Sequence, residues 1–427
     1  MDNMYPFQRE AVQFIERAGG NAFVGDDPGT GKTIIALGYC YNHPTIKRVL
    51  IVAPTVVVYK WKAEIARWLD KTGNVVDTTK TPITKDPFQI MSYTMMRLRA
   101  EELAALAWDL IVFDEAHHLK DRLALQTKMA RRISKRSKRR LMLSGKPFLN
   151  QPTELFNPCN IMNPVVFSWP RFWMRFFYNT GFGWSVKAGA QEALKAFLTP
   201  HIIRRTKKDV LTELPDLQRV MLPFRLEKDD RDEYDNAMVL ARCEPNVLVA
   251  ANRLRQAVGK AKMIVAGEWV KNFLEENPKE KVVVYAHHLA VMRYLADLLQ
   301  VEGVSVIDGS VPAKERAERA GKFQDSQYPR VMVIDMAASE GIDLFKASNI
   351  LFAEREWVPN LEEQAESRLH RNGQKNAVVA YYLEAMDTYD EHLADVIERK
   401  RAAFNELMPS DDVDTVVKEI MDWVRRK

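Results

Sequence analysis

The sequence predicts an α/β fold made of two parallel-sheet domains. Two observations lead to this prediction. At 427 residues, the chain is longer than one hydrophobic core usually serves. In two separate parts of the chain, short apolar runs alternate with segments of helical period, and this alternation is typical of parallel sheets covered by helices.

The first alternating part predicts four buried strands, at residues 48–53, 88–93, 110–113 and 140–143. Amphipathic stretches such as 61–69 predict helices between them. From 151 to about 272 the sequence becomes aromatic-rich and charged with a helical period, and we expect no strands there.

The second alternating part predicts five strands, at residues 281–286, 305–307, 330–334, 349–353 and 377–383. The rest of the chain is charged and helical in period, with a break at Met408-Pro-Ser-Asp-Asp412 that predicts a pair of terminal helices. We therefore place an N-terminal domain at 1–222, with a helical protrusion at about 151–200. The C-terminal domain follows at 223–427, with a helical protrusion at about 225–275 and terminal helices at 388–427.

Composition restricts the class of protein. The net charge of +5 permits an anionic partner but does not require one. Three widely spaced cysteines, Cys40, Cys159 and Cys243, argue against a dense disulfide framework and against a paired zinc site. The first residues lack a leader pattern, and no apolar stretch is long enough to span a bilayer. We expect an intracellular protein, cytoplasmic or nucleoid-associated, without a membrane partner.

A glycine-rich segment, Gly25-Asp-Asp-Pro-Gly-Thr-Gly-Lys-Thr33, lies between a short apolar run and a helical stretch. This is the context of a phosphate-binding loop, in which glycines let backbone N–H groups approach phosphate oxygens and a lysine reaches the outer phosphates. The strict pattern has glycine where Asp26 stands, and a plain glycine turn before a helix is the alternative. The residues predicted to bind ATP are Gly29, Thr30, Gly31, Lys32 and Thr33, and the Thr33 hydroxyl is also suited to ligate Mg²⁺.

Two adjacent carboxylates follow the predicted strand at 110–113, in the segment Asp114-Glu-Ala-His117. They would lie at the carboxyl edge of the sheet, where α/β proteins bind ligands. Asp114 is suited to hold Mg²⁺, directly or through water, and Glu115 to polarise the attacking water. Acidic pairs are also common on solvated loops, but their order after a phosphate loop favours a phosphoryl-transfer site. We predict that Lys32, Asp114 and Glu115 are catalytic.

A predicted helix from about Asn360 places Gln364, Arg368 and Arg371 on one face by their spacing of i, i+4 and i+7. Arginines placed in this way can reach a phosphate. The alternative is that they are surface arginines on an exposed helix. The residues alone leave both interpretations open.

Several motifs occur in the order found in superfamily-two helicases. Two of them, Asp114-Glu-Ala-His-His-Leu-Lys120 and Leu141-Met-Leu-Ser-Gly-Lys-Pro-Phe-Leu-Asn150, resemble motifs II and III. The motifs that follow are Ile203-Arg-Arg-Thr-Lys-Lys-Asp-Val210, Ile307-Asp-Gly-Ser310, Glu340-Gly-Ile-Asp-Leu344 and Gln364-Ala-Glu-Ser-Arg-Leu-His-Arg-Asn-Gly-Gln374. Together they cover nearly the whole chain, which resembles the Swi/Snf branch of this superfamily.

The resemblance implies two RecA-like lobes with helical insertions between them and a DNA-dependent ATPase that uses ATP and Mg²⁺. It implies that Arg368 and Arg371 are catalytic, reaching across the cleft to stabilise charge on the γ-phosphate. Gln8 matches the glutamine that contacts adenine. Gly341 and Asp343 lie in the matching motif V, where Asp343 would hold the ribose or relay closure, although many relatives have asparagine there.

Basic clusters at 131–140 and 204–208 could neutralise phosphates, although a charge run is usually a solvated face. The resemblance supports the second cluster and implies that duplex DNA runs across both lobes, held mainly through its backbone. A buried tryptophan that packs one lobe is an equal alternative for Trp357. The residues predicted to contact nucleic acid are Ser92, Arg204, Arg205, Ser310, Ser339 and Trp357.

The function implied is an ATP-hydrolysing motor that translocates on duplex or branched DNA as a monomer, similar to compact fork-remodelling or annealing members of the family. Two alternatives stay open: a strand-separating DNA or RNA helicase, and an ATP-dependent DNA clamp without productive turnover. The chain departs from the family pattern at Lys146, where threonine is usual, and at Ala338-Ser339, which replaces a glycine pair. Coupling between ATP and DNA could therefore differ.

Overall fold

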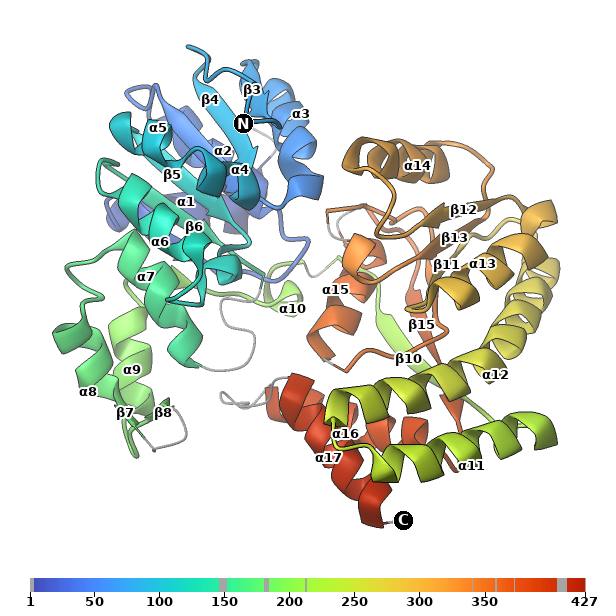
Figure 1. Cartoon of the computed structure of the whole chain (residues 1–427). Helices are drawn as coiled ribbons and strands as arrows, with labels where there is room; N and C mark the ends of the chain where they lie inside the picture. Colours follow the sequence, from blue (N-terminus) through green and yellow to red (C-terminus); the bar gives the residue numbers. More distant parts are fainter. Residues whose placement is uncertain are drawn as a thin grey trace. The chain divides into compact units, whose positions relative to one another are not determined.

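The computed structural model describes residues 4–145, 152–179, 184–211, 213–339, 341–357, 359–371, 373–404 and 413–426. The chain forms two compact units, Met1–Thr212 and Glu213–Lys427 (Figure 1). Lys146 and the expected break at 408–412 lie outside the described residues.

The first unit is built on a parallel sheet that contains seven strands within its described residues. Each strand predicted in this part of the chain is present. In spatial order the strands are β3 (Gly73–Val76), β4 (Phe88–Ser92), β2 (Val49–Ala53), β5 (Leu110–Asp114), β6 (Arg140–Leu143), β1 (Asn21–Val24) and β9 (Ile202–Ile203).

Helices cover both faces of this sheet, and for that reason β2 is wholly apolar and β5 is apolar up to Asp114. Alternate residues of β2 point into opposite clusters, Leu50 and Val52 into one and Val49 and Ile51 into the other. The helices of the unit are α1 (Pro6–Arg17), α2 (Lys32–Asn42), α3 (Val58–Leu69), α4 (Tyr93–Leu98), α5 (Ala100–Ala105), α6 (Leu125–Ser134), α7 (Phe156–Met162), α8 (Met174–Phe176), α9 (Gln191–Leu198) and α10 (Lys207–Val210).

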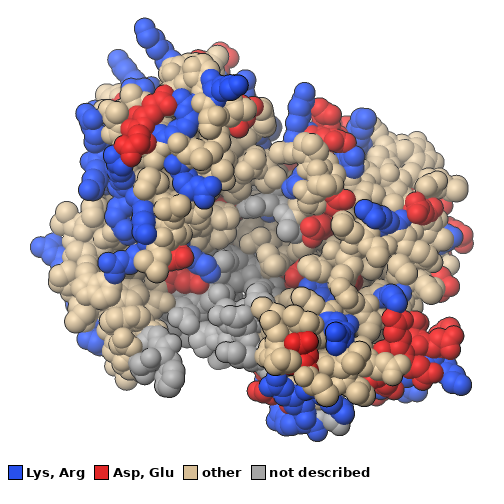
Figure 2. Space-filling model, in the orientation of Figure 1, with Lys and Arg blue, Asp and Glu red and all other residues tan. Residues whose placement is uncertain are grey.

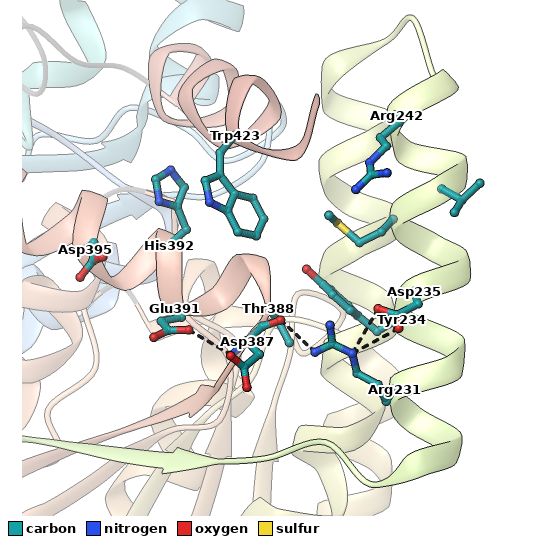
Figure 3. A pocket seen from close by; sticks show the side chains of 12 residues that line it. Arg231, Tyr234, Asp235, Arg242, Asp387, Thr388, Glu391, His392, Asp395 and Trp423 are labelled. Atoms are coloured by element: carbon teal, nitrogen blue, oxygen red, sulfur yellow. Dashed lines mark hydrogen bonds and ion pairs between the residues drawn. The ribbon is translucent and has the colours of Figure 1, made fainter. Parts of the chain in front are cut away.

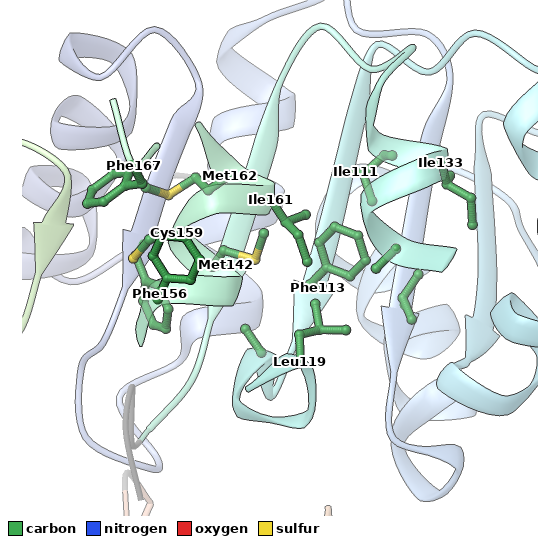
Figure 4. Packing of buried hydrophobic residues seen from close by; sticks show 14 of the residues in the cluster. Ile111, Phe113, Leu119, Ile133, Met142, Phe156, Cys159, Ile161, Met162 and Phe167 are labelled. Carbon is green, nitrogen blue, oxygen red and sulfur yellow. The ribbon is translucent and has the colours of Figure 1, made fainter. Parts of the chain in front are cut away.

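Figure 4 shows the cluster on one face, where Phe113 of β5 and Met142 of β6 pack beneath Ile161 of α7. The aromatic-rich stretch extends this cluster: Phe167 and Phe172 are both fully buried in it. Burying each large apolar side chain contributes about 1.5–3 kcal/mol. The aromatic-rich stretch therefore contributes side chains to the core of the first unit, although Trp169 and Tyr178 within it are exposed.

The expectation of no strands between 151 and 272 is wrong. The segment contains an antiparallel hairpin of β7 (Phe177–Asn179) and β8 (Trp184–Val186), the short β9, and β10 (Leu217–Phe224). The first three strands have two or three residues each, too few to show a period. β10 is an edge strand in which none of the residues is fully buried. Gln218 and Arg219 near its start and Pro223 near its end interrupt the pattern that marks a central strand.

The second unit also contains a parallel sheet, with six strands among its described residues. In spatial order they are β10, β15 (Val378–Ala385), β14 (Asn349–Phe352), β11 (Val282–Tyr285), β13 (Val331–Ile334) and β12 (Val304–Ile307). The helices are α11 (Lys228–Cys243), α12 (Val247–Glu276), α13 (Leu289–Leu298), α14 (Ala313–Asp325), α15 (Pro359–Leu369), α16 (Tyr389–Phe404) and α17 (Val413–Arg426).

The division between the units lies at residue 212, ten positions before the expected boundary at 222. The difference arises because β10 pairs with β15 over its whole length and so belongs to the second sheet. The helices α11, α12, α16 and α17 share one apolar cluster beside this sheet.

The two parallel sheets with helical insertions confirm the predicted fold class. Over the described part of the chain, every helix is too short or too polar to cross a lipid bilayer.

Candidate active site

The glycine-rich segment forms the connection between β1 and α2, as predicted. Gly29 and Gly31 have φ of 88° and 84°, in the left-handed region that favours glycine. Gly31 also faces the amide of Gln8, whose nitrogen would lie 2.4 Å from an added Cβ. The loop therefore needs glycine at these two positions for its backbone conformation.

Lys32 is the first residue of α2 and points back over the loop. Its Nζ donates to the carbonyl oxygens of Asp26 at 2.8 Å and Asp27 at 3.2 Å. Burial lowers the pKa of Lys32, while the carboxylates of Glu115 and Asp114 act in the opposite direction. Thr33 follows in the same first turn. The lysine is thus held at the loop in the vicinity of two acidic groups.

Gln8 lies in the first turn of α1 and is 3% exposed. Its Nε2 donates to the carbonyl oxygen of Thr30 at 2.9 Å, and its Oε1 accepts the backbone N–H of Tyr5 at 3.0 Å. Gln8 therefore contacts the phosphate loop itself. The amide provides both a donor and an acceptor, the property on which the adenine prediction rests.

Asp26, which stands where the strict loop pattern has glycine, is fully buried and paired with Arg205. The guanidinium contacts both carboxylate oxygens, Nε–Oδ1 at 3.2 Å and Nη2–Oδ2 at 2.5 Å, and donates to the carbonyl of Phe7 at 2.6 Å. Because β9 pairs with β1, it places Arg205 beside the loop. The departure from the glycine pattern thus creates a buried ion pair that joins the loop to a segment 179 residues away.

Asp114 and Glu115 lie at the carboxyl end of β5, as predicted. Trp61 Nε1 donates to Asp114 Oδ2 at 2.8 Å, and the Glu115 N–H donates to Asp114 Oδ1 at 3.1 Å. Burial and then the Glu115 carboxylate raise the pKa of Asp114 to about 6, against the effects of Trp61 and Lys32. A cation beside Asp114 would favour its ionised form.

Glu115 has φ 50° and ψ 54°, a left-handed conformation that is uncommon outside glycine. Its Oε2 accepts from Ser144 Oγ at 3.3 Å and lies 3.2 Å from His117 Nδ1. His117 Nδ1 is also 3.1 Å from Ser144 Oγ. Motifs II and III are therefore connected through three polar side chains, and the strained backbone places the Glu115 carboxylate among them.

Motif III also approaches the phosphate loop. A Cβ added to Gly145 would lie 2.7 Å from Cγ of Pro28, so glycine is needed at this contact. The Ser144 N–H donates to the carbonyl of Val24 at 3.1 Å. The three motifs of the first unit therefore meet at one edge of its sheet.

Thr33 and Asp114 offer the hard oxygen donors that Mg²⁺ prefers. Among the described residues, no group of three or more histidine, cysteine or carboxylate side chains gathers as a metal cage. This donor set fits a metal that is bound together with nucleotide phosphates, since such Mg²⁺ ions take only one or two protein ligands.

In the second unit, Arg368 lies in the last turn of α15, whereas Arg371 follows the end of the helix. The expectation that one helical face carries both is therefore wrong, because α15 ends at Leu369. Arg371 Nη1 is ion-paired with Asp343 Oδ1, so two predicted site residues meet there. Arg368 Nε is buried and has no hydrogen-bond partner among the described residues. Gly341, with φ 76°, precedes Asp343 in the same loop.

The structure distributes the predicted nucleic-acid residues unevenly. Ser92 caps α4, and Ser339 donates to the carbonyl of Met336 at 2.7 Å; both are buried. Trp357 is buried with Arg255 over its ring, which matches the packing alternative. Of the residues predicted to contact nucleic acid, Arg204 and Ser310 are exposed, whereas Arg205 forms an ion pair with Asp26.

Lysine and arginine side chains are frequent on the face of the first unit that Figure 2 shows. In the basic cluster at 131–140, however, Arg140 donates to three backbone carbonyls. Arg132 pairs with Glu101 and Lys138 with Asp109. Part of this cluster therefore stabilises the fold instead of presenting free positive charge.

A cavity of about 620 Å³ lies among α11, α16 and α17 of the second unit (Figure 3). Positively and negatively charged side chains line its wall. Arg231 Nε lies 3.1 Å from Asp235 Oδ1, and Arg231 Nη1 donates to the carbonyl of Asp387 at 2.9 Å. None of the predicted site residues lines it. The cavity is separate from the motif residues.

The fold and site together define a protein of the phosphate-loop class, with a glycine-rich loop after β1 and an acidic pair at the end of β5. Residues 7–268 match the model of the SNF2-related domain, and residues 266–373 match the helicase conserved C-terminal domain. The chain belongs to the SNF2-related family. This confirms the resemblance drawn from the motifs.

Among curated relatives, the DNA annealing helicase and endonuclease ZRANB3 of Bos taurus is 29% identical over 433 residues, covering 93% of this chain and 40% of the relative. The SWI/SNF-related matrix-associated actin-dependent regulator of chromatin subfamily A-like protein 1 of Xenopus tropicalis is 30% identical over 434 residues, covering 93% and 44%. The chain thus spans less than half the length of these two relatives.

Among solved structures, the Hef helicase domain of Pyrococcus furiosus matches with a TM-score of 0.58 and 15% identity. The match covers 92% of this chain and 97% of the other. It shows a shared fold.

The contacts of the site that were not predicted include Trp61 with Asp114, His117 and Ser144 with Glu115, and Arg205 with Asp26. His117 lies in motif II and Ser144 in motif III, each shortly after a strand, and this position could have indicated that both approach the site. Trp61 gave no such signal, because it belongs to a helix in which an apolar face is sufficient to explain it.

We predict that Arg205→Ala lowers the free energy of unfolding by about 3 kcal/mol, because it leaves the carboxylate of Asp26 buried without its partner. Urea denaturation measures the effect. Arg204→Ala is the matched control, since Arg204 is exposed. The double variant Asp26→Ala/Arg205→Ala should recover part of the loss. A single variant as stable as the unaltered chain would contradict the role of this pair.

We predict that Asp114→Asn stabilises the nucleotide-free chain in EDTA by about 1–2 kcal/mol at pH 7.5. A carboxyl group whose pKa is raised to about 6 opposes folding once it is ionised, so the gain should vanish as the pH falls below about 4. Denaturation at both pH values measures this.

Asp109→Asn is the control for this prediction. Burial raises the pKa of Asp109, but hydrogen bonds from Lys138 and from the backbone of Lys47 and Arg48 outweigh it and leave the pKa lowered. Asp109→Asn should therefore destabilise at pH 7.5. Equal effects of the two substitutions would show that the environment of Asp114 is not special.

Proposed function

We propose that this chain hydrolyses ATP and uses it to translocate on double-stranded or branched DNA. The observation that carries the proposal is the meeting of Lys32, Asp114 and Glu115 at one edge of the first sheet. These are the groups that phosphoryl transfer to water needs: a cation for the phosphates, a carboxylate for the metal, and a carboxylate for the water. Membership of the SNF2-related family supports this interpretation.

Mg²⁺ would be held by Thr33 and Asp114 and would neutralise charge on the phosphates. Glu115 would orient the attacking water and accept its proton, because its carboxylate is fixed by Ser144 and lies beside His117. Lys32 would turn from the loop carbonyls to the phosphates. Arg368 and Arg371 of the second unit would contribute positive charge to the transfer.

DNA as the partner is supported by the family and by two named relatives, one a DNA annealing helicase and endonuclease and the other a regulator of chromatin. Exposed Arg204 and Ser310 are suited to contact phosphate groups, which positions a protein on a duplex without reading its sequence. Gln8 is proposed to exchange the carbonyl of Thr30 for the adenine edge. We propose that the chain acts as a monomer inside the cell.

ATP hydrolysis by the full chain with no nucleic acid, single-stranded DNA, duplex DNA, forked DNA and RNA tests this function. We predict stimulation by duplex or forked DNA. Glu115→Gln should lower the stimulated rate at least about 100-fold while ATP binding persists, because the water loses its base. Lys32→Ala should weaken ATP binding itself.

Glu101→Gln is the control, because Glu101 is an exposed carboxylate paired with Arg132 on the surface. It should leave the rate unchanged. If only single-stranded DNA or RNA stimulates hydrolysis, the proposed function changes from a duplex translocase to an unwinding helicase. If no nucleic acid stimulates hydrolysis, the remaining function is an ATP-dependent DNA clamp without productive turnover.

A further inference from the structure

Trp61 lies on α3 and is 1% exposed. Its Nε1–H donates to Oδ2 of Asp114 over 2.8 Å, although the two residues are 53 positions apart in the chain. They meet because α3 packs on the sheet through the apolar cluster that also contains Ile65. The indole N–H and the carboxylate thus form a polar contact beside an otherwise apolar cluster.

The rest of Asp114 is held as well. Its Oδ1 accepts the N–H of Glu115 at 3.1 Å, and its carbonyl accepts the hydroxyl of Tyr93 at 2.8 Å. The carboxylate therefore has a donor on each oxygen and a fixed backbone. Donors of this kind orient a metal ligand and set its affinity for the metal.

Other buried tryptophans of the first unit do not make such a contact. Trp108 is also 1% exposed, and its Nε1 donates to the carbonyl of Leu103 at 3.0 Å. Trp173 Nε1 is buried without a hydrogen-bond partner among the described residues. A buried indole in this fold therefore does not require a carboxylate, and packing alone would be satisfied by phenylalanine at position 61.

We propose that Trp61 is a positioning residue for the Mg²⁺ of the ATP site, acting through the carboxylate of Asp114. This rests on the proposed function, because it takes Asp114 as a ligand of the nucleotide-bound metal. The indole N–H keeps Oδ2 in place, so the carboxylate is already oriented when the metal and nucleotide arrive. Without the N–H, the carboxylate can rotate and metal binding must order it.

The test uses the full chain with Trp61→Phe, which removes the N–H but keeps an aromatic ring. Binding of a fluorescent ATP analogue is titrated with Mg²⁺ and also measured in EDTA. We expect the Mg²⁺ concentration for half-maximal binding to rise about 10-fold. Affinity in EDTA should stay unchanged, because the nucleotide still meets the same loop. Mn²⁺ in place of Mg²⁺ allows the bound metal to be counted by electron paramagnetic resonance.

Trp108→Phe is the matched control, equally buried and also a donor, and it should leave both titrations unchanged. Trp61→His restores a ring N–H and should recover part of the metal affinity. If Trp61→Phe does not fold in a thermal unfolding assay, the comparison of Trp61→His with the unaltered chain carries the test.

Two results would overturn the role of Trp61. One is an unchanged Mg²⁺ requirement in folded Trp61→Phe, together with no difference between this variant and Trp61→His. The other is an equal loss of nucleotide affinity with and without metal, which describes a structural role. An unaltered chain that binds Mg²⁺ and ATP but is not stimulated by DNA would remove the proposed motor and leave this inference standing.

Discussion

The arrangement of the first unit depends on three neighbouring parallel strands that end at the same edge of the sheet. β1, β6 and β5 pair so that Val24 and Asp114 both lie opposite Leu143. Whatever follows these residues is therefore close in space, and it is the phosphate loop, the acidic pair and the Ser144-Gly145 turn that follow. Parallel strands need long connections, so residues distant in sequence meet at this edge.

At this edge of the sheet, residues proposed to act in catalysis are held in arrangements that lower the stability of the fold. Lys32 and Asp114 have pKa values shifted in the directions that disfavour their charged forms, and Glu115 has a strained backbone. A site of this kind persists because the surrounding sheet is well packed on both faces. In the second unit, Asp343 pairs with Arg371, which follows the end of α15.

Much of the fold could be predicted because the central strands are buried on both faces and therefore form apolar runs. The phosphate loop and acidic pair could be predicted because their residues are contiguous and follow such runs. The ion pair of Asp26 and Arg205 could not, since it depends on β9, a strand of two residues. Periodicity also extended α15 to Arg371, because a spacing of seven positions does not reveal where a helix ends.

The pairing of β9 with β1 has a mechanical consequence. The Gly25 N–H donates to the carbonyl of Ile203 at 2.7 Å, and the Asp27 N–H donates to the carbonyl of Arg205 at 3.1 Å. These backbone hydrogen bonds join the phosphate loop to the segment that leads out of the first unit. The unit ends at Thr212, a few residues later. A force on the chain that connects the two units would therefore act close to the glycine-rich loop.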